Sequence, residues 1–217
     1  MKSDRDIRQD VEAELKWSPD VEETDIAVKV TEGAVTLSGF VKSFFEKYRA
    51  EVAARRVKGV AAVANDLQVK LPSAGRSDPE LARAAVAALK EKLPFTAEQI
   101  VPTVKDGHVY LSGEVEWNYQ REYAEEAIRH IKGITGLRNS LTVKPTVAPP
   151  DNIKHRIEDA FRRIAQVDAG KIVVDTSGSE VTLRGEVRSW AERDQAQATA
   201  WSAPGVSFVK NEISVRT

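Results

Sequence analysis

The side chains able to carry out acid–base chemistry or to bind a metal are few and scattered in this chain. It has three histidines and no cysteine, so disulfides, thiolate zinc sites and thiol catalysis are excluded. His108, His130 and His155 share no spacing typical of metal ligands. Acidic pairs such as Glu22 and Glu23 are sequence neighbours and indicate a solvated surface. The sequence predicts no catalytic residue, no metal site and no cofactor.

Three glycines stand in nearly identical phrases, VTLSGFV, VYLSGEV and VTLRGEV. They are Gly39, Gly113 and Gly185, spaced by 74 and then 72 residues. One small module is therefore written three times. We expect each glycine to be structural and to let a helix cross a strand closely. The alternative is that these glycines contact the backbone of a ligand.

Asparagine repeats at the same spacing, as Asn65, Asn139 and Asn211. A side-chain amide oxygen can help to coordinate a cation. Asparagine also bonds readily to its own local backbone. We expect the local, structural role, and cation coordination remains the alternative.

Aromatic residues gather where the second strand of each module should meet the second helix. The candidates for surface contact are Phe44, Phe45, Trp117, Tyr119 and Trp190. Capping boxes are expected at this junction in the first and third modules, as Ser43 with Glu46 and Ser189 with Glu192. These aromatic side chains either cover the end of the sheet and fill contacts between modules, or anchor the protein at an interface between an apolar phase and water. Five basic residues lie nearby and are candidates for contact with anionic headgroups: Lys42, Lys47, Arg49, Arg121 and Arg188.

The apolar spacing gives each module the order α-β-β-α-β. A first helix is expected from apolar residues four apart, and alternation then predicts two strands joined as a hairpin. A second helix and a third strand complete the unit. The fold class is α+β: each module is a three-stranded mixed sheet with two helices on one face. Pro102 places the first strand at an edge. The modules are predicted at residues 1–72, 77–145 and 151–217.

These phrases resemble the BON domain family (bacterial OsmY and nodulation domain). Val-x-Leu-Ser-Gly-x-Val is followed by a helix, by Gly59-Val60 and by the stretch VANDLQV at residues 63–69. The resemblance covers essentially the whole chain as three tandem copies. It implies a non-enzymatic, stress-related binding or scaffold protein that contacts phospholipid surfaces or envelope-associated partners. One relative that joins this domain to another kind of domain binds potassium, so a cytoplasmic sensor of a monovalent cation is an alternative. A purely structural protein–protein interaction module is another.

The amino-acid composition of the chain limits the kinds of partner that we expect it to bind. Lys and Arg number 32 against 33 Asp and Glu, and no module is basic, so nucleic acid is not expected as a partner. No apolar run is long enough to span a membrane. The N-terminus has no signal-peptide core, so we expect a cytoplasmic protein, or a periplasmic one if a leader has been removed.

Overall fold

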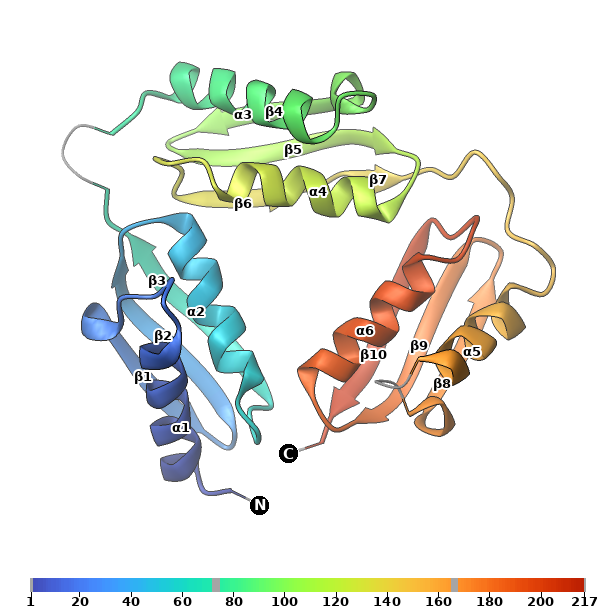
Figure 1. Cartoon of the computed structure of the whole chain (residues 1–217), viewed down its shortest axis with the longest axis horizontal. Coiled ribbons are helices and arrows are strands. Elements are labelled where there is room, and N and C mark those ends of the chain that lie inside the picture. The colour runs from blue at the N-terminus through green and yellow to red at the C-terminus, as the bar shows by residue number, and fades with distance from the viewer. Residues whose placement is uncertain (1, 72–74, 165–167, 217) are drawn as a thin grey trace. The chain divides into compact units, whose positions relative to one another are not determined.

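Each repeat folds in the predicted order α-β-β-α-β (Figure 1). The computed structural model describes residues 2–71, 75–164 and 168–216. The chain divides into two compact units, one of residues 1–113 and 119–141 and the other of residues 114–118 and 142–216. Residue 72, where the first module was predicted to end, and residues 1 and 217 lie outside the described residues.

The bounds of the elements agree closely between repeats. The first has α1 (Asp4–Trp17), β1 (Ile26–Thr31), β2 (Ala34–Val41), α2 (Phe44–Arg56) and β3 (Ala62–Val69). The second has α3 (Asp78–Lys92), β4 (Ile100–Lys105), β5 (His108–Val115), α4 (Asn118–Arg129), β6 (Gly136–Asn139) and β7 (Thr142–Val143). The third has α5 (Ile153–Arg163), β8 (Ile172–Ser177), β9 (Glu180–Val187), α6 (Trp190–Trp201) and β10 (Phe208–Val215). A single 3-10 turn precedes the first strand of each repeat: η1 (Glu23–Asp25), η2 (Ala97–Gln99) and η3 (Ala169–Lys171).

Each sheet takes its strands from one repeat, and its middle strand is the second in chain order. β2 pairs antiparallel with β1 and parallel with β3. The parallel pairing follows from the helical crossover between the two strands. β4, which carries Pro102, lies at an edge as predicted. In the second repeat β6 and β7 both pair with β5, so the third strand there comes as two segments.

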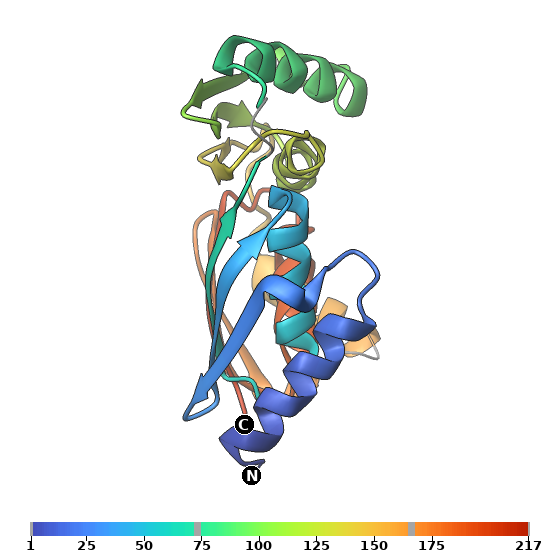
Figure 2. The ribbon, with the colours of Figure 1, turned by 90° about the vertical axis from the view of Figure 1, so that its left-hand side faces the viewer.

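Both helices of a repeat pack on the same face of its sheet. Figure 2 shows α1 and α2 on one side of β1, β2 and β3. The predicted apolar stripe of the first helix is buried in all three repeats, as Ile7, Val11 and Leu15, then Leu81, Ala85 and Leu89, then Ile153, Ile157 and Phe161. A fully buried side chain of this size contributes about 1.5–3 kcal/mol, so this stripe is a main source of stability. Among the residues that the structure describes, no helix of the same repeat covers the opposite face of its sheet.

An aspartate at the start of the first helix binds the hairpin turn in two repeats. The Asp4 carboxylate accepts hydrogen bonds from the backbone N–H groups of Glu32 and Gly33, at 2.8 and 2.9 Å. Asp78 accepts the same two bonds from Asp106 and Gly107. These turns need positive φ at both central residues, as a two-residue hairpin does. The first helix and the hairpin are thereby joined at one end of the module.

Candidate functional site

The three repeated glycines are explained by a close approach between backbones. Gly39 has φ of +120°, and a Cβ there would overlap the carbonyl oxygen of Asp25 at the end of η1. Gly113 and Gly185 meet the carbonyls of Gln99 and Lys171 in the same way. The expectation that a helix crosses the strand here was wrong, because the near neighbour is the 3-10 turn that leads into the edge strand. The backbone of the neighbouring segment already fills the space beside each glycine, which favours a structural role.

The three repeated asparagines lie within the third strand and link it to the second helix. Nδ2 of Asn65 donates to the carbonyl of Lys47 on α2 at 3.0 Å, and its Oδ1 accepts from the N–H of Leu67 at 3.3 Å. Asn139 and Asn211 make the corresponding bonds to Arg121 and Leu141 and to Arg193 and Ile213. The local backbone bond was expected, whereas the bond to the helix was not. Both ends of each amide are occupied, so the asparagines favour a structural role over cation binding.

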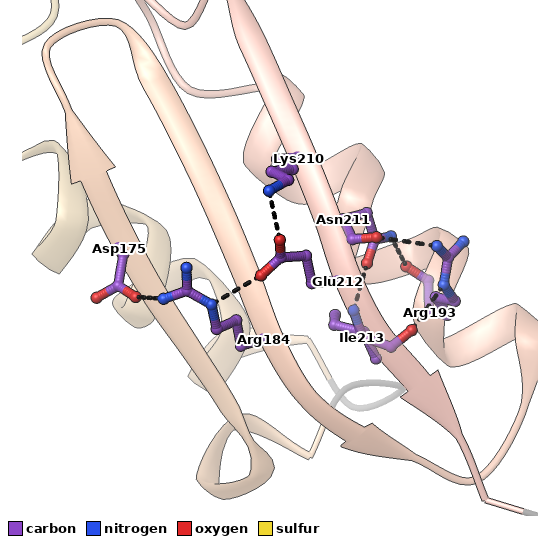
Figure 3. Close-up of polar contacts among 7 residues, drawn as sticks. All are labelled: Asp175, Arg184, Arg193, Lys210, Asn211, Glu212 and Ile213. Carbon is purple, nitrogen blue, oxygen red and sulfur yellow. Dashed lines mark hydrogen bonds and ion pairs between the residues drawn. The ribbon is translucent and has the colours of Figure 1, made fainter.

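A basic side chain completes this link at the free edge of the sheet. Lys47 Nζ donates to the carbonyl of Leu67 at 2.7 Å. In the third repeat Arg193 donates to the carbonyls of Ile213 and Asn211, at 3.0 and 3.1 Å (Figure 3). Backbone groups on an edge strand are a template for pairing with another chain. Asparagine and the basic residue together occupy these groups and so protect the edge.

The expected capping boxes at the second helix are only half formed. Ser43 accepts from the N–H of Glu46, as a cap should. The buried Glu46 carboxylate does not reach back to Ser43; it accepts from the N–H groups of Glu22 and Lys42, at 2.8 and 2.7 Å. Glu192 makes the same pair of bonds to Asp168 and Arg188. The carboxylate therefore fastens the segment that follows the first helix to the end of the second strand.

The aromatic candidates differ in how much surface they present. Phe44, Phe45, Trp117 and Trp190 are half-buried, and Trp190 packs against the guanidinium of Arg193. Tyr119 is exposed by 50%. Of the five candidates, Tyr119 is thus the one most available to a partner.

The most exposed aromatic residue of the second repeat was missed by the sequence analysis. Phe95 lies 97% exposed in the loop between α3 and η2. Its counterpart in the first repeat, Val21, is buried. In the second repeat α3 is one residue longer than α1, and Leu93 and Ala97 are buried on either side of the phenylalanine. The loop is therefore anchored at both ends while Phe95 projects from it.

Two tyrosines of α4 belong to the same end of the second repeat. Gln120 Nε2 donates to Thr96 Oγ1 at 3.0 Å, which holds the Phe95 loop against the start of α4. Tyr119 and Tyr123 are one turn apart and meet edge to face, with ring centroids 5.6 Å apart. Lys92 Nζ lies 5.1 Å from the centre of the Tyr123 ring. Phe95, Tyr119 and Tyr123 together make up the aromatic end of the second module.

An acidic or backbone partner lies beside four of the basic candidates near the junctions: Lys42, Lys47, Arg49 and Arg188. Lys42 pairs with Glu22, whose carboxylate raises the pKa of this lysine. Arg49 pairs with Asp20 at 3.1 Å, and Arg188 lies 3.7 Å from Asp168. A nearby carboxylate therefore offsets the charge of Lys42, Arg49 and Arg188.

The open sheet face of the third repeat carries a row of charges (Figure 3). Arg184 bridges Asp175 on β8 and Glu212 on β10, with N–O distances of 2.5 and 2.8 Å. Lys210 also pairs with Glu212, and this bond and the one from Arg184 lower the pKa of that carboxyl. The Glu212 carboxylate in turn raises the pKa of Arg184. Exposed pairs of this kind contribute little stability, but they leave the face polar and its charges balanced.

The part of the chain that the structure describes holds neither a candidate metal site nor a candidate membrane span. No three His, Asp or Glu side chains gather there in a way that could hold a metal ion. None of the helices among residues 2–71, 75–164 and 168–216 is long and apolar enough to cross a bilayer.

Comparison with known proteins identifies the repeat. The BON domain matches three times, at residues 3–70, 77–145 and 151–217. The chain belongs to the BON domain family. Osmotically-inducible protein Y of Escherichia coli (strain K12) is 33% identical over 147 residues, which cover 65% of this chain and 73% of that protein. The resemblance seen in the sequence is therefore confirmed, and the BON modules account for nearly the whole chain.

Two solved structures of a structural protein of the type III secretion system, CdsD of Chlamydia trachomatis, also align with these BON modules. The alignment with the first covers 97% of this chain and 92% of the CdsD chain, at 15% identity and a TM-score of 0.26. The other, its C-terminal domain, covers both chains fully at 14% identity and a TM-score of 0.27. Scores this low do not establish a shared arrangement of the whole chain.

Proposed function

We propose that this chain is a non-enzymatic binding protein that acts in the response to osmotic stress. It contacts phospholipid surfaces through the aromatic end of its second BON module. The name of the Escherichia coli relative supports the link to osmotic stress. The family resemblance supports the phospholipid surface. The observation that carries the proposed site is the almost complete exposure of Phe95 on a loop whose flanking residues are buried.

The chemistry of these side chains suits the interface between a phospholipid bilayer and water. Phe95 presents a whole ring to solvent, while Tyr119 and Tyr123 combine an apolar ring with a hydroxyl. Three of the basic residues near the junctions are paired with carboxylates, and the formal net charge is −1. Binding therefore rests mainly on aromatic contact and depends only weakly on salt.

Co-sedimentation with phospholipid vesicles tests the proposal. Phe95→Ser removes the exposed ring without opening a cavity, so stability should hold. Burying such a ring contributes about 1.5–3 kcal/mol, so the substitution should weaken vesicle binding about tenfold or more. Phe208→Ser is the matched control, because Phe208 is exposed by 51% on the open sheet face of the third module. Equal binding by the parent and Phe95→Ser would contradict the site. Failure of the parent chain to sediment, together with capture of an envelope protein through Phe95, would replace the lipid by a protein partner.

A further inference from the structure

The third module has a groove between its two helices. The groove has a volume of about 420 Å³ and is lined by α5 and by α6 with the residues that follow it. In the first module the corresponding gap is bridged by Glu14 and Arg56, whose charged atoms are 3.8 Å apart. In the second it is bridged by Lys92 and Glu126 at 3.2 Å. Neither ion pair has a counterpart among the described residues of the third module.

Small and apolar residues take the places of both bridges. Counting along the repeat, Ala160 and Ser202 replace the pair of Glu14 and Arg56. Ile164 and Ala198 likewise replace Lys92 and Glu126. All four of the replacing residues line the groove.

The floor of the groove offers little hydrogen bonding. Thr199 Oγ1 donates to the carbonyl of Gln195, and Ser202 Oγ donates to the carbonyl of Ala198, both at 2.8 Å. Both hydroxyl groups therefore already donate to carbonyls of α6. Ile157, Ile164 and Ala203 add apolar surface to the groove, and the Gln195 side chain is among its polar lining.

Two arginines of α5 supply charge at this groove. Arg156 and Arg163 line it, and no lining residue is acidic. Neither arginine forms an ion pair with any residue that the structure describes. The two arginines are two helical turns apart, about 10 Å along the axis of α5. The groove therefore has a positive charge near each of its ends. In contrast Arg162, on the same helix, pairs with Asp159 at 2.8 Å.

We propose that this groove binds a small organic anion with an apolar body, of the class of a medium-chain carboxylate. Its volume lies in the range of small-molecule sites, about 300–1,000 Å³, and is too small for a folded partner. The apolar body lies on Ile157, Ile164 and Ala203, and the carboxylate accepts hydrogen bonds from the guanidinium of Arg156 or Arg163. This site is separate in sequence and in chemistry from the aromatic end of the second module.

Calorimetric titration of the full chain with octanoate tests the site, with shifts of the α5 and α6 amide signals in NMR spectra to locate binding. Octylammonium has the same chain length with the opposite charge, and acetate has the head without the body. Octanoate should bind and shift signals in α5 and α6, while the other two should bind at least about tenfold more weakly, the scale of one lost charge-assisted bond. Equal binding of octylammonium, or shifts confined to other elements, would overturn the proposal.

Two double substitutions test separately the contribution of the arginine charges and that of the open groove. Arg156→Gln with Arg163→Gln should weaken octanoate binding about tenfold or more, while the control Arg162→Gln should leave it unchanged. Ile164→Lys with Ala198→Glu rebuilds the bridge of the second module and should close the groove without loss of the fold. Octanoate binding that survives both double substitutions would also overturn the site. Phe95→Ser should keep full octanoate binding, so failure of the vesicle proposal is distinguishable from failure of this one.

Discussion

The fixed phrase of the BON repeat is explained at the scale of single residues by backbone geometry. Gly113 has φ of +131°, and a Cβ there would overlap the carbonyl of Gln99. Gly113→Ala should therefore lower the free energy of unfolding by at least about 2 kcal/mol, as measured by urea denaturation. Gly178→Asn is the control, because Gly178 has φ of +57° with no atom within 4 Å of its Cβ position, and asparagine tolerates that φ. Similar losses in the two variants would mean that the loss at Gly113 is not specific to its close approach to the Gln99 carbonyl.

A second residue-scale prediction concerns the cap of α3. The Glu80 carboxylate accepts from the hydroxyl and the backbone N–H of Ser77, and these bonds lower its pKa. A lowered pKa adds stability that is present above the pKa of the unfolded chain and is lost as the pH falls through the folded value. In Ser77→Ala the pKa of Glu80 should rise toward its ordinary value, as followed by NMR titration of the carboxyl carbon.

The stability of the Ser77→Ala variant should depend on pH in the same sense. Its deficit against the parent should be largest near neutral pH and should shrink once Glu80 is protonated in both proteins. Ser112→Ala, at an exposed serine of β5, is the control and should show no such dependence. A deficit that is constant with pH would assign the effect to the lost hydroxyl cap alone.

At the scale of elements, the link between the third strand and the second helix should be visible in amide exchange. The N–H of Leu67 donates to Asn65 Oδ1, whereas the N–H of Lys70 donates to the carbonyl of Val41 at 2.8 Å. In Asn65→Ala the Leu67 amide should exchange at least about tenfold faster, while the Lys70 amide keeps most of its protection. An equal loss at both amides would indicate general destabilisation rather than loss of a side chain that protects the edge.

The elements themselves were predictable, because their apolar periodicity repeats three times. The edge position of β4 also followed from Pro102 alone. What the sequence did not predict was which atoms meet. The neighbour of Gly39 is a carbonyl of η1, and the partners of Glu46 lie in two segments far apart in sequence. Such contacts depend on three-dimensional register, which a periodic pattern does not contain.

Part of the candidate site was likewise hidden by the repeat. Phe95 aligns with the buried Val21, so the repeat predicts burial. The extra residue of α3 and the burial of Leu93 change the path of the loop and turn Phe95 outward. Tyr119 was identified because aromatic residues cluster where the second strand of each module meets the second helix.

At the scale of the whole molecule, three separate sheets raise the question of whether the BON modules unfold together. Each sheet takes its strands from one repeat, with boundaries predicted near residues 73–77 and 148–151. Gly113→Val adds a branched side chain against the Gln99 carbonyl and should unfold the second module. If the modules are independent, the first and third should keep their native signals.

Reporter side chains in each core allow that outcome to be read in one NMR experiment on the full chain. Leu37 reports the first module, Ile128 the second and Trp201 the third, and all three side chains are buried. In Gly113→Val we expect the native methyl signal of Ile128 to vanish, while the Leu37 methyl and the Trp201 indole signals stay in place. Loss of all three together would show one cooperative unit, because coupling between modules would then outweigh the stability of each module alone. Selective loss would mean that each BON module is stabilised by its own core, so that the aromatic end and the groove can be studied without disturbing one another.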